Sequence, residues 1–179
     1  MDDEHIHARP DDDCGSGTSW RDVLVDHHKN PGGNRLGLLP AYRLYANPVY
    51  QRLVDKLGIA SVYILSAAWG LIRGDFRTPY YDITFSASER GDDAYKRRRK
   101  AELYEDFRML PDDTADEVLF FGGKDYIPLF CKLSAGVKSK RTVFYSSGHP
   151  PDAPGCVLAK FETTTRTNWH YECANRAVC

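Results

Sequence analysis

The 179-residue sequence predicts a single α/β domain over residues 20–179, with a mostly parallel central sheet flanked by helices. The first observation behind this prediction is that short apolar runs rich in β-branched and aromatic residues alternate with segments of helical periodicity. The second is that each predicted strand ends in a polar or glycine-rich string. Because ligands bind beyond the carboxyl ends of the strands in parallel sheets, we expect a binding site at that edge.

Composition restricts the class of protein further. With 42% hydrophobic and 27% charged residues, the chain is not a disordered, collagen-like or coiled-coil protein. Its 24 basic and 25 acidic residues nearly cancel, so the total charge indicates neither a nucleic-acid nor a membrane partner. No apolar run reaches the ~20 residues of a membrane span, and the five cysteines have no C-x-x-C spacing. We expect a cytoplasmic protein with free thiols and with neither a metal nor a cofactor.

The first third of the chain contains a leader and the first predicted elements. Residues 1–19 are acidic and rich in small polar side chains, which predicts a disordered leader rather than a secretory signal. Residues 23–25 (Val-Leu-Val) are a short buried-strand candidate. Asn47 and Pro48 resemble an N-cap and a first-turn proline, so we expect a helix over the nine residues that follow.

The alternation of strands and helices continues to the end of the chain. Two aspartates at 92–93 can cap a long helix, and Pro128 fits the first turn of a later one. The remaining strands are expected over residues 61–65, 117–121, 141–145 and 157–161, and the remaining helices over residues 94–110, 126–133 and 168–177.

The string Asp26-His27-His28-Lys29 follows the first predicted strand. Histidine titrates near neutral pH and lysine binds phosphate, so the string is a candidate anion-binding or acid/base site with Lys29 as a phosphate ligand. The alternative interpretation is a solvated loop.

Two strings in the middle of the chain supply candidate substrate ligands. Ser66 and Gly70 allow a ligand to approach the backbone closely, and Trp69 offers a ring for stacking. Alternatively, Trp69 fills the core and Gly70 makes a turn. Tyr81 and Asp82 place a carboxylate among aromatic residues, which makes Asp82 a candidate general base, or else the centre of an Asx turn.

Two later strings follow the third and fourth predicted strands. Gly122, Gly123 and Lys124 lead into a helix N-terminus, where N–H groups favour an anion, although a simple tight turn fits equally well. The spacing is not that of a Walker P-loop, so we do not expect a nucleoside triphosphatase. His149 lies in a loop that two prolines make rigid, which suits a histidine aimed at one ligand atom.

The last predicted helix begins in a dense run of hydrogen-bonding side chains. Arg166 and Asn168 are candidate substrate ligands, and His170 and Glu172 are candidate proton carriers. The alternative interpretation is an amphipathic packing helix.

Five consecutive basic residues occupy positions 96–100. Positive charge near the N-terminus of the predicted helix opposes the helix dipole, so helix stability does not explain the run. Lys96, Arg97 and Arg98 are therefore candidate phosphate ligands. Alternatively, they form a solvated face that the neighbouring acidic residues neutralise.

Several stretches together resemble the YaaA-like superfamily of bacterial proteins. Residues 40–50 (PAYRLYANPVY) resemble its P-A-x-x-L-Y-x-S-x-x-F helix entry, and residues 63–71 (YILSAAWGL) resemble its ILSAxYGL signature. Residues 79–82 (PYYD) and 121–126 (FGGKDY) lie near its PYD and aGkxY motifs. The family's cysteine or serine after the first strand has no counterpart in Asp26-His27-His28-Lys29, so its role is not carried over. The resemblance implies a link to peroxide stress, DNA binding or tRNA-base modification.

The carboxyl half is similar to the uracil-DNA-glycosylase fold. Residues 118–124 resemble its third strand and turn, and residues 142–151 (TVFYSSGHPP) resemble the strand that leads to its HPSP loop. In that loop a histidine contacts the uracil carbonyl, and His149 stands at its place. The water-activating GQDPY motif has no match in the sequence, so hydrolysis is not implied. The resemblance implies a pocket for a nucleobase, nucleoside or nucleotide.

These observations lead to two hypotheses. The first is an enzyme that acts on a nucleobase, nucleoside or nucleotide by glycosidic-bond or base-modification chemistry. Trp69 or Tyr81 would stack on the base, Asp82 would bind its edge, and His149 would stabilise developing negative charge. The alternative is a non-catalytic stress-response protein that binds DNA or RNA through the basic run and exposed aromatic residues.

Overall fold

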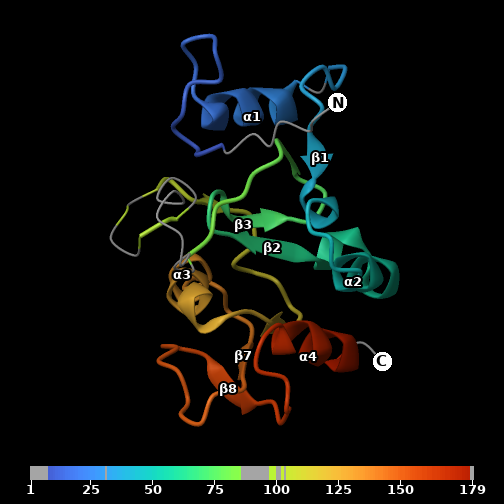
Figure 1. Cartoon of the computed structure of the whole chain (residues 1–179), viewed down its shortest axis with the longest axis vertical. Coiled ribbons are helices and arrows are strands. Elements are labelled where there is room, and N and C mark those ends of the chain that lie inside the picture. Colours follow the sequence, from blue (N-terminus) through green and yellow to red (C-terminus); the bar gives the residue numbers. More distant parts are fainter. Residues whose placement is uncertain (1–7, 31, 86–96, 100–101, 103, 178–179) are drawn as a thin grey trace.

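A computed structural model describes residues 8–30, 32–85, 97–99, 102 and 104–177 of the chain (Figure 1). The helices are α1 (Trp20–Lys29), α2 (Val49–Leu57), α3 (Ile127–Leu133) and α4 (Trp169–Ala177), and the strands are β1 (Leu39–Pro40), β2 (Tyr63–Ser66), β3 (Gly70–Arg73), β4 (Arg77–Thr78), β5 (Phe107–Arg108), β6 (Val118–Phe120), β7 (Arg141–Tyr145) and β8 (Val157–Lys160). Figure 1 shows α1 at one end of the molecule and β7 with β8 at the other, with β2 and β3 between them. The protein is therefore a mixed α/β structure, as the sequence predicts.

The strands form three small sheets in the described part of the chain. Strands β6, β7 and β8 are parallel to one another, whereas β2 and β3 form an antiparallel pair to which β5 adds in parallel. Strands β1 and β4 form the third, antiparallel pair. The expectation of one mostly parallel sheet thus describes the carboxyl half alone. The three residues between β2 and β3 are too few for a parallel crossover, so these strands pair as a hairpin.

The elements with explicit end signals lie where the sequence predicts them. The side chain of Asn47 accepts a hydrogen bond from the Val49 N–H at 3.0 Å at the start of α2, and Gly58 ends this helix with a φ of 79°. Pro128 occupies the first turn of α3. The strand predicted over residues 141–145 coincides with β7.

The strand predicted over residues 23–25 is wrong, because these residues belong to α1. The Ser19 hydroxyl accepts a hydrogen bond from the Asp22 N–H at 3.2 Å and caps the helix. Trp20 and Leu24, four residues apart, then bury one face. A run of three apolar residues does not by itself distinguish a strand from a helix segment.

The helix predicted over residues 94–110 is also wrong in its described parts, residues 97–99, 102 and 104–110, while residues 94–96, 100–101 and 103 lie outside the description. Phe107 and Arg108 form β5 beside β3. Arg98 turns into the interior and forms a two-pronged ion pair with Asp106 at 2.6 and 2.8 Å. This interior pair requires an irregular backbone instead of a solvated helix face.

The expected disordered leader differs from the structure at residues 8–19. Ala8 and Pro10 are buried, and the Asp13 carboxylate accepts hydrogen bonds from the N–H groups of residues 15, 16 and 17 at 2.7–3.1 Å. These bonds lower the pKa of Asp13, the one from Gly15 most. The folded unit therefore begins before residue 20, whereas residues 1–7 lie outside the description.

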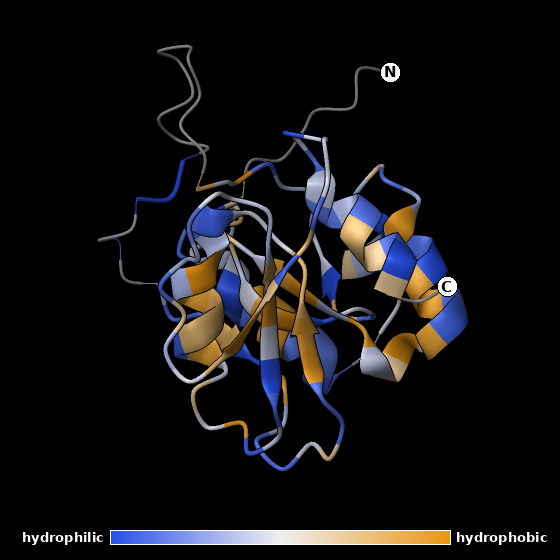
Figure 2. Cartoon of the chain, turned by 90° about the horizontal axis from the view of Figure 1, so that it is seen from below, coloured by the Kyte–Doolittle hydropathy of each residue, from blue (hydrophilic) through white to orange (hydrophobic). Residues whose placement is uncertain are grey.

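The core consists of two apolar clusters. The larger surrounds Trp69 and includes Leu24, Ile64 and Ile72, and the smaller packs Phe120 against Phe130 with ring centroids 4.6 Å apart. Figure 2 shows hydrophobic colour along the central strands and hydrophilic colour on the outer sides of the helices. Among the described residues, no helix has the length and apolar character needed to cross a membrane.

Candidate functional site

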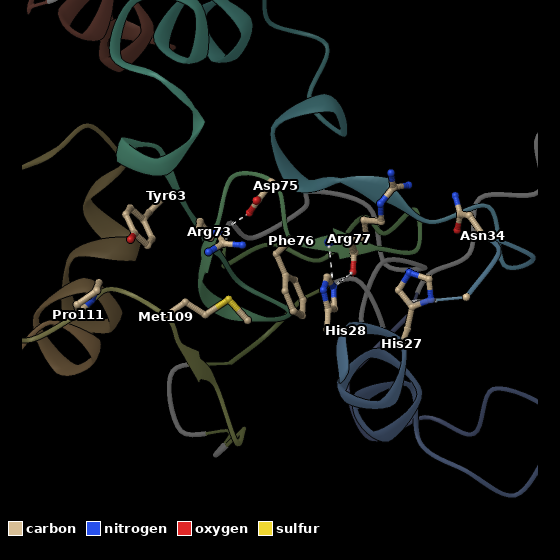
Figure 3. A pocket seen from close by; sticks show the side chains of 11 residues that line it. His27, His28, Asn34, Tyr63, Arg73, Asp75, Phe76, Arg77, Met109 and Pro111 are labelled. Carbon is tan, nitrogen blue, oxygen red and sulfur yellow. Dashed lines mark hydrogen bonds and ion pairs between the residues drawn. The ribbon is translucent and has the colours of Figure 1, made fainter. Parts of the chain in front are cut away.

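A groove with a volume of about 730 Å³ lies between the end of α1 and the β3–β4 connection (Figure 3). We call it the α1 groove. Its lining residues are His27, His28, Gly32, Asn34, Tyr63, Arg73, Asp75, Phe76, Arg77, Met109 and Pro111. They come from segments far apart in the sequence.

The backbone between β3 and β4 positions the charged wall of the groove. The Gly74 N–H donates to the Val62 carbonyl at 2.7 Å, and the Phe76 N–H donates to the Arg73 carbonyl at 3.0 Å. A side chain at Gly74 would press against the Val62 carbonyl oxygen, which would lie 3.0 Å from its Cβ. This tight turn brings Arg73, Asp75 and Arg77 to one side of the groove.

His28 joins α1 to β4. Its Nε2 lies 3.1 Å from both the N–H and the carbonyl oxygen of Arg77, so it accepts from the one or donates to the other according to the tautomer, and its ring stacks on Phe76 with centroids 4.0 Å apart and planes 11° from parallel. Burial lowers the pKa of His28, and the hydrogen bond with Arg77 raises it by less. His28 therefore fixes the groove wall more than it supplies charge.

The groove carries two arginines against one aspartate. Arg73 forms an ion pair with Asp75 at 2.5 Å, and this hydrogen bond raises the pKa of Arg73. Arg77 donates to the Leu38 carbonyl at 3.2 Å. Because a guanidinium has five N–H donors, this one bond leaves Arg77 able to hold a further acceptor. The wall can therefore bind an anion.

The two ends of the groove differ in character. Figure 3 shows Tyr63, Met109 and Pro111 at one end and His27 and Asn34 at the other, with the arginines between them. The Asn34 side chain exchanges two 2.9 Å hydrogen bonds with the Leu38 backbone, so it shapes the loop. One end of the groove is thus largely apolar and the other polar.

A second assembly, which we call the tyrosine cluster, gathers residues from five segments: Tyr45, Tyr50, Tyr81, Tyr126 and Tyr171. The Tyr45 and Tyr81 hydroxyls share a hydrogen bond of 2.7 Å, and Tyr45 stacks on Tyr50 with centroids 4.7 Å apart. Burial raises the pKa of Tyr81 to about 12 and that of Tyr45 well above its usual value. These hydroxyls are neutral and bind one another. The cluster joins several of the YaaA-like stretches, but it does so as part-buried packing.

The string at the end of β2 serves the packing of this region. The Ser66 hydroxyl accepts hydrogen bonds from the Ala68 and Trp69 N–H groups at 3.1 and 3.0 Å, and the Trp69 side chain is fully buried. A Cβ at Gly70 would lie 2.6 Å from the Phe107 carbonyl oxygen, so glycine permits the β3–β5 contact. This arrangement matches the alternative in which Trp69 fills the core and Gly70 makes a turn.

The remaining central candidates are dispersed. Tyr81 belongs to the tyrosine cluster, whereas Asp82 beside it is exposed. Gly122 lies against the Phe120 ring, where a side chain would clash. Gly123 precedes the short 3-10 turn Lys124–Tyr126, in which Lys124 is exposed.

The carboxyl-terminal candidates do not line the α1 groove. His149 is exposed, and its carbonyl accepts a hydrogen bond from the Ser147 hydroxyl at 2.6 Å. His170 packs on Tyr171 with ring centroids 4.2 Å apart, and burial lowers the pKa of His170. Arg166 and Asn168 are exposed.

Glu172 ties the segment after β8 to α4. Its carboxylate accepts a hydrogen bond from the Thr163 hydroxyl at 2.8 Å and another from Thr165, and it pairs with Arg176 at 2.5 Å. The bond from Thr163 is the largest cause that lowers the pKa of Glu172. A carboxylate held in this way is suited to positioning a loop, and its lowered pKa works against a role as proton donor.

Among the predicted phosphate ligands, Arg98 is not available to bind a phosphate. Its side chain is buried on Asp106, donates to the Ala67 carbonyl at 3.0 Å, and lies 4.1 Å from the centre of the Tyr104 ring. Lys29 is exposed at the end of α1, and Arg97 is exposed, whereas Lys96 lies outside the description.

The sequence identifies one wall of the groove and misses the other. His27 and His28 belong to a string that the sequence singles out, although they lie on a helix. Arg73, Asp75 and Arg77 belong to no motif. Their alternation around a glycine-containing turn is the one signal that could have indicated charged side chains on a common side.

No family model, curated protein or solved structure matches the chain. In the ranges that the structure describes, no group of three histidine, cysteine, aspartate or glutamate side chains is placed to hold a metal ion. The geometry of the α1 groove therefore carries the functional argument.

Proposed function

We propose that the protein binds a nucleotide in the α1 groove, with its phosphate on the arginine wall and its base toward the Tyr63 end. The observation that carries this proposal is that Arg73 and Arg77 both line a groove with Tyr63, Met109 and Pro111 at one end. A nucleotide has the same division into an anionic and a planar apolar part.

The size and charge of the groove agree with this ligand class. Small-molecule sites usually have volumes of roughly 300–1,000 Å³, and this groove has about 730 Å³. Arginine binds phosphate in a two-pronged geometry, and its charge is not titrated near neutral pH. The Tyr63 ring, with Met109 beside it, offers a surface on which a base can stack.

The proposal concerns binding of the nucleotide, and a direct test is needed for its chemical conversion. Asp82, His149, His170 and Glu172, the predicted catalytic residues, are not among the residues that line the groove. His27 does line the groove, and it belongs to the string Asp26-His27-His28-Lys29, which the sequence predicts as a candidate acid/base site. If the bound nucleotide reacts, His27 is the first residue to replace.

We also propose that the carboxyl half has a uracil-DNA-glycosylase-like fold and that the chain is related to the YaaA-like superfamily. The support is the parallel register of β6, β7 and β8, in which Val118 faces Arg141 and Thr142 faces Val157, with α3 as the connection from β6 to β7. An experimental structure with a different order of these strands would contradict this part alone.

Isothermal titration calorimetry with the four ribonucleoside monophosphates tests the binding proposal. We expect binding of at least one of them, and weaker binding of its nucleoside and of inorganic phosphate. Arg77→Gln should weaken binding by about tenfold or more, because it removes a charged donor to phosphate. Lys56→Gln makes the same change of charge at an exposed position of α2 and should leave affinity unchanged.

Two results would overturn the proposal. One is the absence of binding to every monophosphate, and the other is equal loss of affinity in Arg77→Gln and Lys56→Gln. Chromatography and mass measurement of the same mixtures show whether a free base is released or the nucleotide is altered, which distinguishes an enzyme that acts on it from a binding protein. Titration with a single-stranded oligonucleotide tests the nucleic-acid alternative, and binding to the oligonucleotide alone would favour it.

A further inference from the structure

Two free cysteines from different elements meet outside the α1 groove. Cys131 lies on α3 and Cys156 lies in the turn before β8, and their Sγ atoms are 3.9 Å apart. The two cysteines are 25 positions apart, and the segment between them includes all of β7. The thiols are therefore in contact across two separate elements.

The surrounding structure holds this contact in place. Cys131 belongs to the smaller core cluster on the buried side of α3, next to Phe130. The Cys156 N–H donates to the Ala153 carbonyl at 3.1 Å, which closes the turn. A disulfide requires a sulfur–sulfur distance of about 2.05 Å. Bond formation therefore requires the two sulfurs to approach by about 2 Å, through rotation of the side chains and movement of the turn.

A cavity lies beside this contact and borders on Cys131 and on the turn that leads to Cys156. Its volume is about 470 Å³, and its lining includes Cys131, Lys132, Arg141 and Asp152. Arg141 donates to the Ser134 hydroxyl at 3.1 Å and to the Gly155 carbonyl at 3.0 Å, which fixes its charge beside the turn. Two positive side chains against one negative favour a small anionic reactant.

We propose that Cys131 and Cys156 form an oxidisable dithiol site whose co-reactant is a small anionic disulfide such as glutathione disulfide. The Cys156 thiolate attacks one sulfur of that disulfide and forms a mixed disulfide, which releases one glutathione thiolate. The Cys131 thiolate then attacks the Cys156 sulfur and releases the second glutathione. Two protein thiols are oxidised, one small disulfide is reduced to two thiols, and both protons leave with the glutathione molecules.

Exposure and ionisation set the order of the two steps. Cys156 is part-exposed and Cys131 is buried, so Cys156 meets the reactant first. Burial, followed by the neighbouring Cys156, raises the pKa of Cys131 to about 11. Once Cys156 is part of a mixed disulfide it no longer ionises, so its charge ceases to oppose ionisation of Cys131. Arg141, which favours the Cys131 thiolate, remains in place.

The product joins α3 covalently to the turn before β8. A bond that closes a loop of this length restricts the unfolded chain and stabilises the folded one. We expect oxidation to raise the melting temperature of the full chain by roughly 5 °C or more.

Intact mass measurement of the full chain after incubation with glutathione disulfide tests the proposal. The wild type should lose the mass of two hydrogens, and peptide mapping should join Cys131 to Cys156. Cys131→Ser should instead accumulate one glutathione on Cys156, because the resolving thiol is missing. Cys14→Ser and Cys173→Ser are matched controls at two other free cysteines, and both should still form the bond.

The proposal is overturned if the wild type keeps both thiols free at every ratio of oxidised to reduced glutathione. It is equally overturned if mapping joins a different pair, such as Cys173 with Cys179. Cys156→Ser gives an independent check, since its melting temperature should not respond to glutathione disulfide. A response equal to that of the wild type would contradict the assignment.

Discussion

Arg98 and the arginines of the α1 groove use the same guanidinium group in opposite ways. The side chain of Arg98 is 4% exposed, and a carboxylate and a carbonyl of the same chain bind it. The Arg73 side chain is 54% exposed, and its partner Asp75 also faces solvent. The basic run at 96–100 suggests an anion site from the sequence, whereas the groove arginines belong to no run. Within the described part of the run Arg98 is buried whereas Arg97 and Arg99 are exposed, so membership of a basic run does not by itself show which guanidinium is available to a ligand.

The tyrosine cluster resembles Arg98 in that its polar groups bind partners within the chain. Its hydroxyls meet one another, as in the 2.7 Å hydrogen bond between Tyr45 and Tyr81. Interior polar groups of this kind stabilise the fold through partners within the chain, and the groove groups are available to a ligand. Substitutions of these two kinds of polar group should therefore differ in their effect on the free energy of unfolding.

The largest effect is expected at the buried ion pair. Arg98→Met removes the two-pronged partner of the buried Asp106 and leaves only the longer contact with Lys132 at 3.9 Å, so the free energy of unfolding in urea should fall by about 3 kcal/mol. Arg97→Met, one residue away and exposed, should change it by less than about 0.5 kcal/mol. The double variant Arg98→Met/Asp106→Leu should recover much of the loss. Equal effects at positions 97 and 98 would remove the distinction between buried and exposed charge.

An intermediate effect is expected in the tyrosine cluster. Tyr81→Phe removes one hydroxyl and leaves the Tyr45 hydroxyl without that hydrogen bond, which should cost about 1–2 kcal/mol of unfolding free energy. Tyr42→Phe removes a hydroxyl that an exposed arginine, Arg43, contacts at 2.8 Å, and should cost less. If the two variants were equally stable, the cluster would not be an interior anchor.

A smaller, pH-dependent effect is expected at His28. Burial lowers its pKa in the folded protein below the 6.5 of an ordinary histidine, so the contribution of the neutral ring to stability is complete above pH 6.5 and is lost as the pH falls below it. The charged groups around the ring are His27, Arg73 and Asp75. The difference in unfolding free energy between the wild type and His28→Gln should therefore shrink on acidification. A difference independent of pH would contradict this assignment.

The smallest effect on stability is expected at the groove arginine itself. Arg77→Gln should change the free energy of unfolding by less than about 0.5 kcal/mol, because the guanidinium has few partners within the chain. The same variant is expected to lose nucleotide affinity. A thermal unfolding curve recorded without ligand checks the first statement, and a large destabilisation would place Arg77 with the interior groups.

The sequence predicts those elements of the fold that carry local signals. Helix α2 follows from Asn47 and Pro48, and α3 follows from a proline that its first turn accommodates. Helix α1 is missed because three apolar residues suit a strand or a helix equally. Strand β5 is missed because Arg98 and Asp106 pair across an irregular segment, which no periodicity reveals.

The candidate site follows from the sequence only in part. The string that contains His27 and His28 attracts attention because its residue types titrate or bind phosphate. Arg73 and Arg77 become neighbours of that string through hydrogen bonds between residues 28 and 77, which lie 49 positions apart. Local sequence patterns carry no information on a contact of that separation. Only the fold can place these charges in one groove.

The amino-terminal segment contacts residues much later in the chain, which has a consequence for folding during synthesis. Arg21 donates to the Glu105 carbonyl, 84 residues further on, and the groove is complete only when Met109 and Pro111 are in place. A ribosome must therefore release more than half of the polypeptide before α1 can dock on its final neighbours. Strands β6, β7 and β8, by contrast, pair with neighbours in sequence order and can assemble as soon as they emerge.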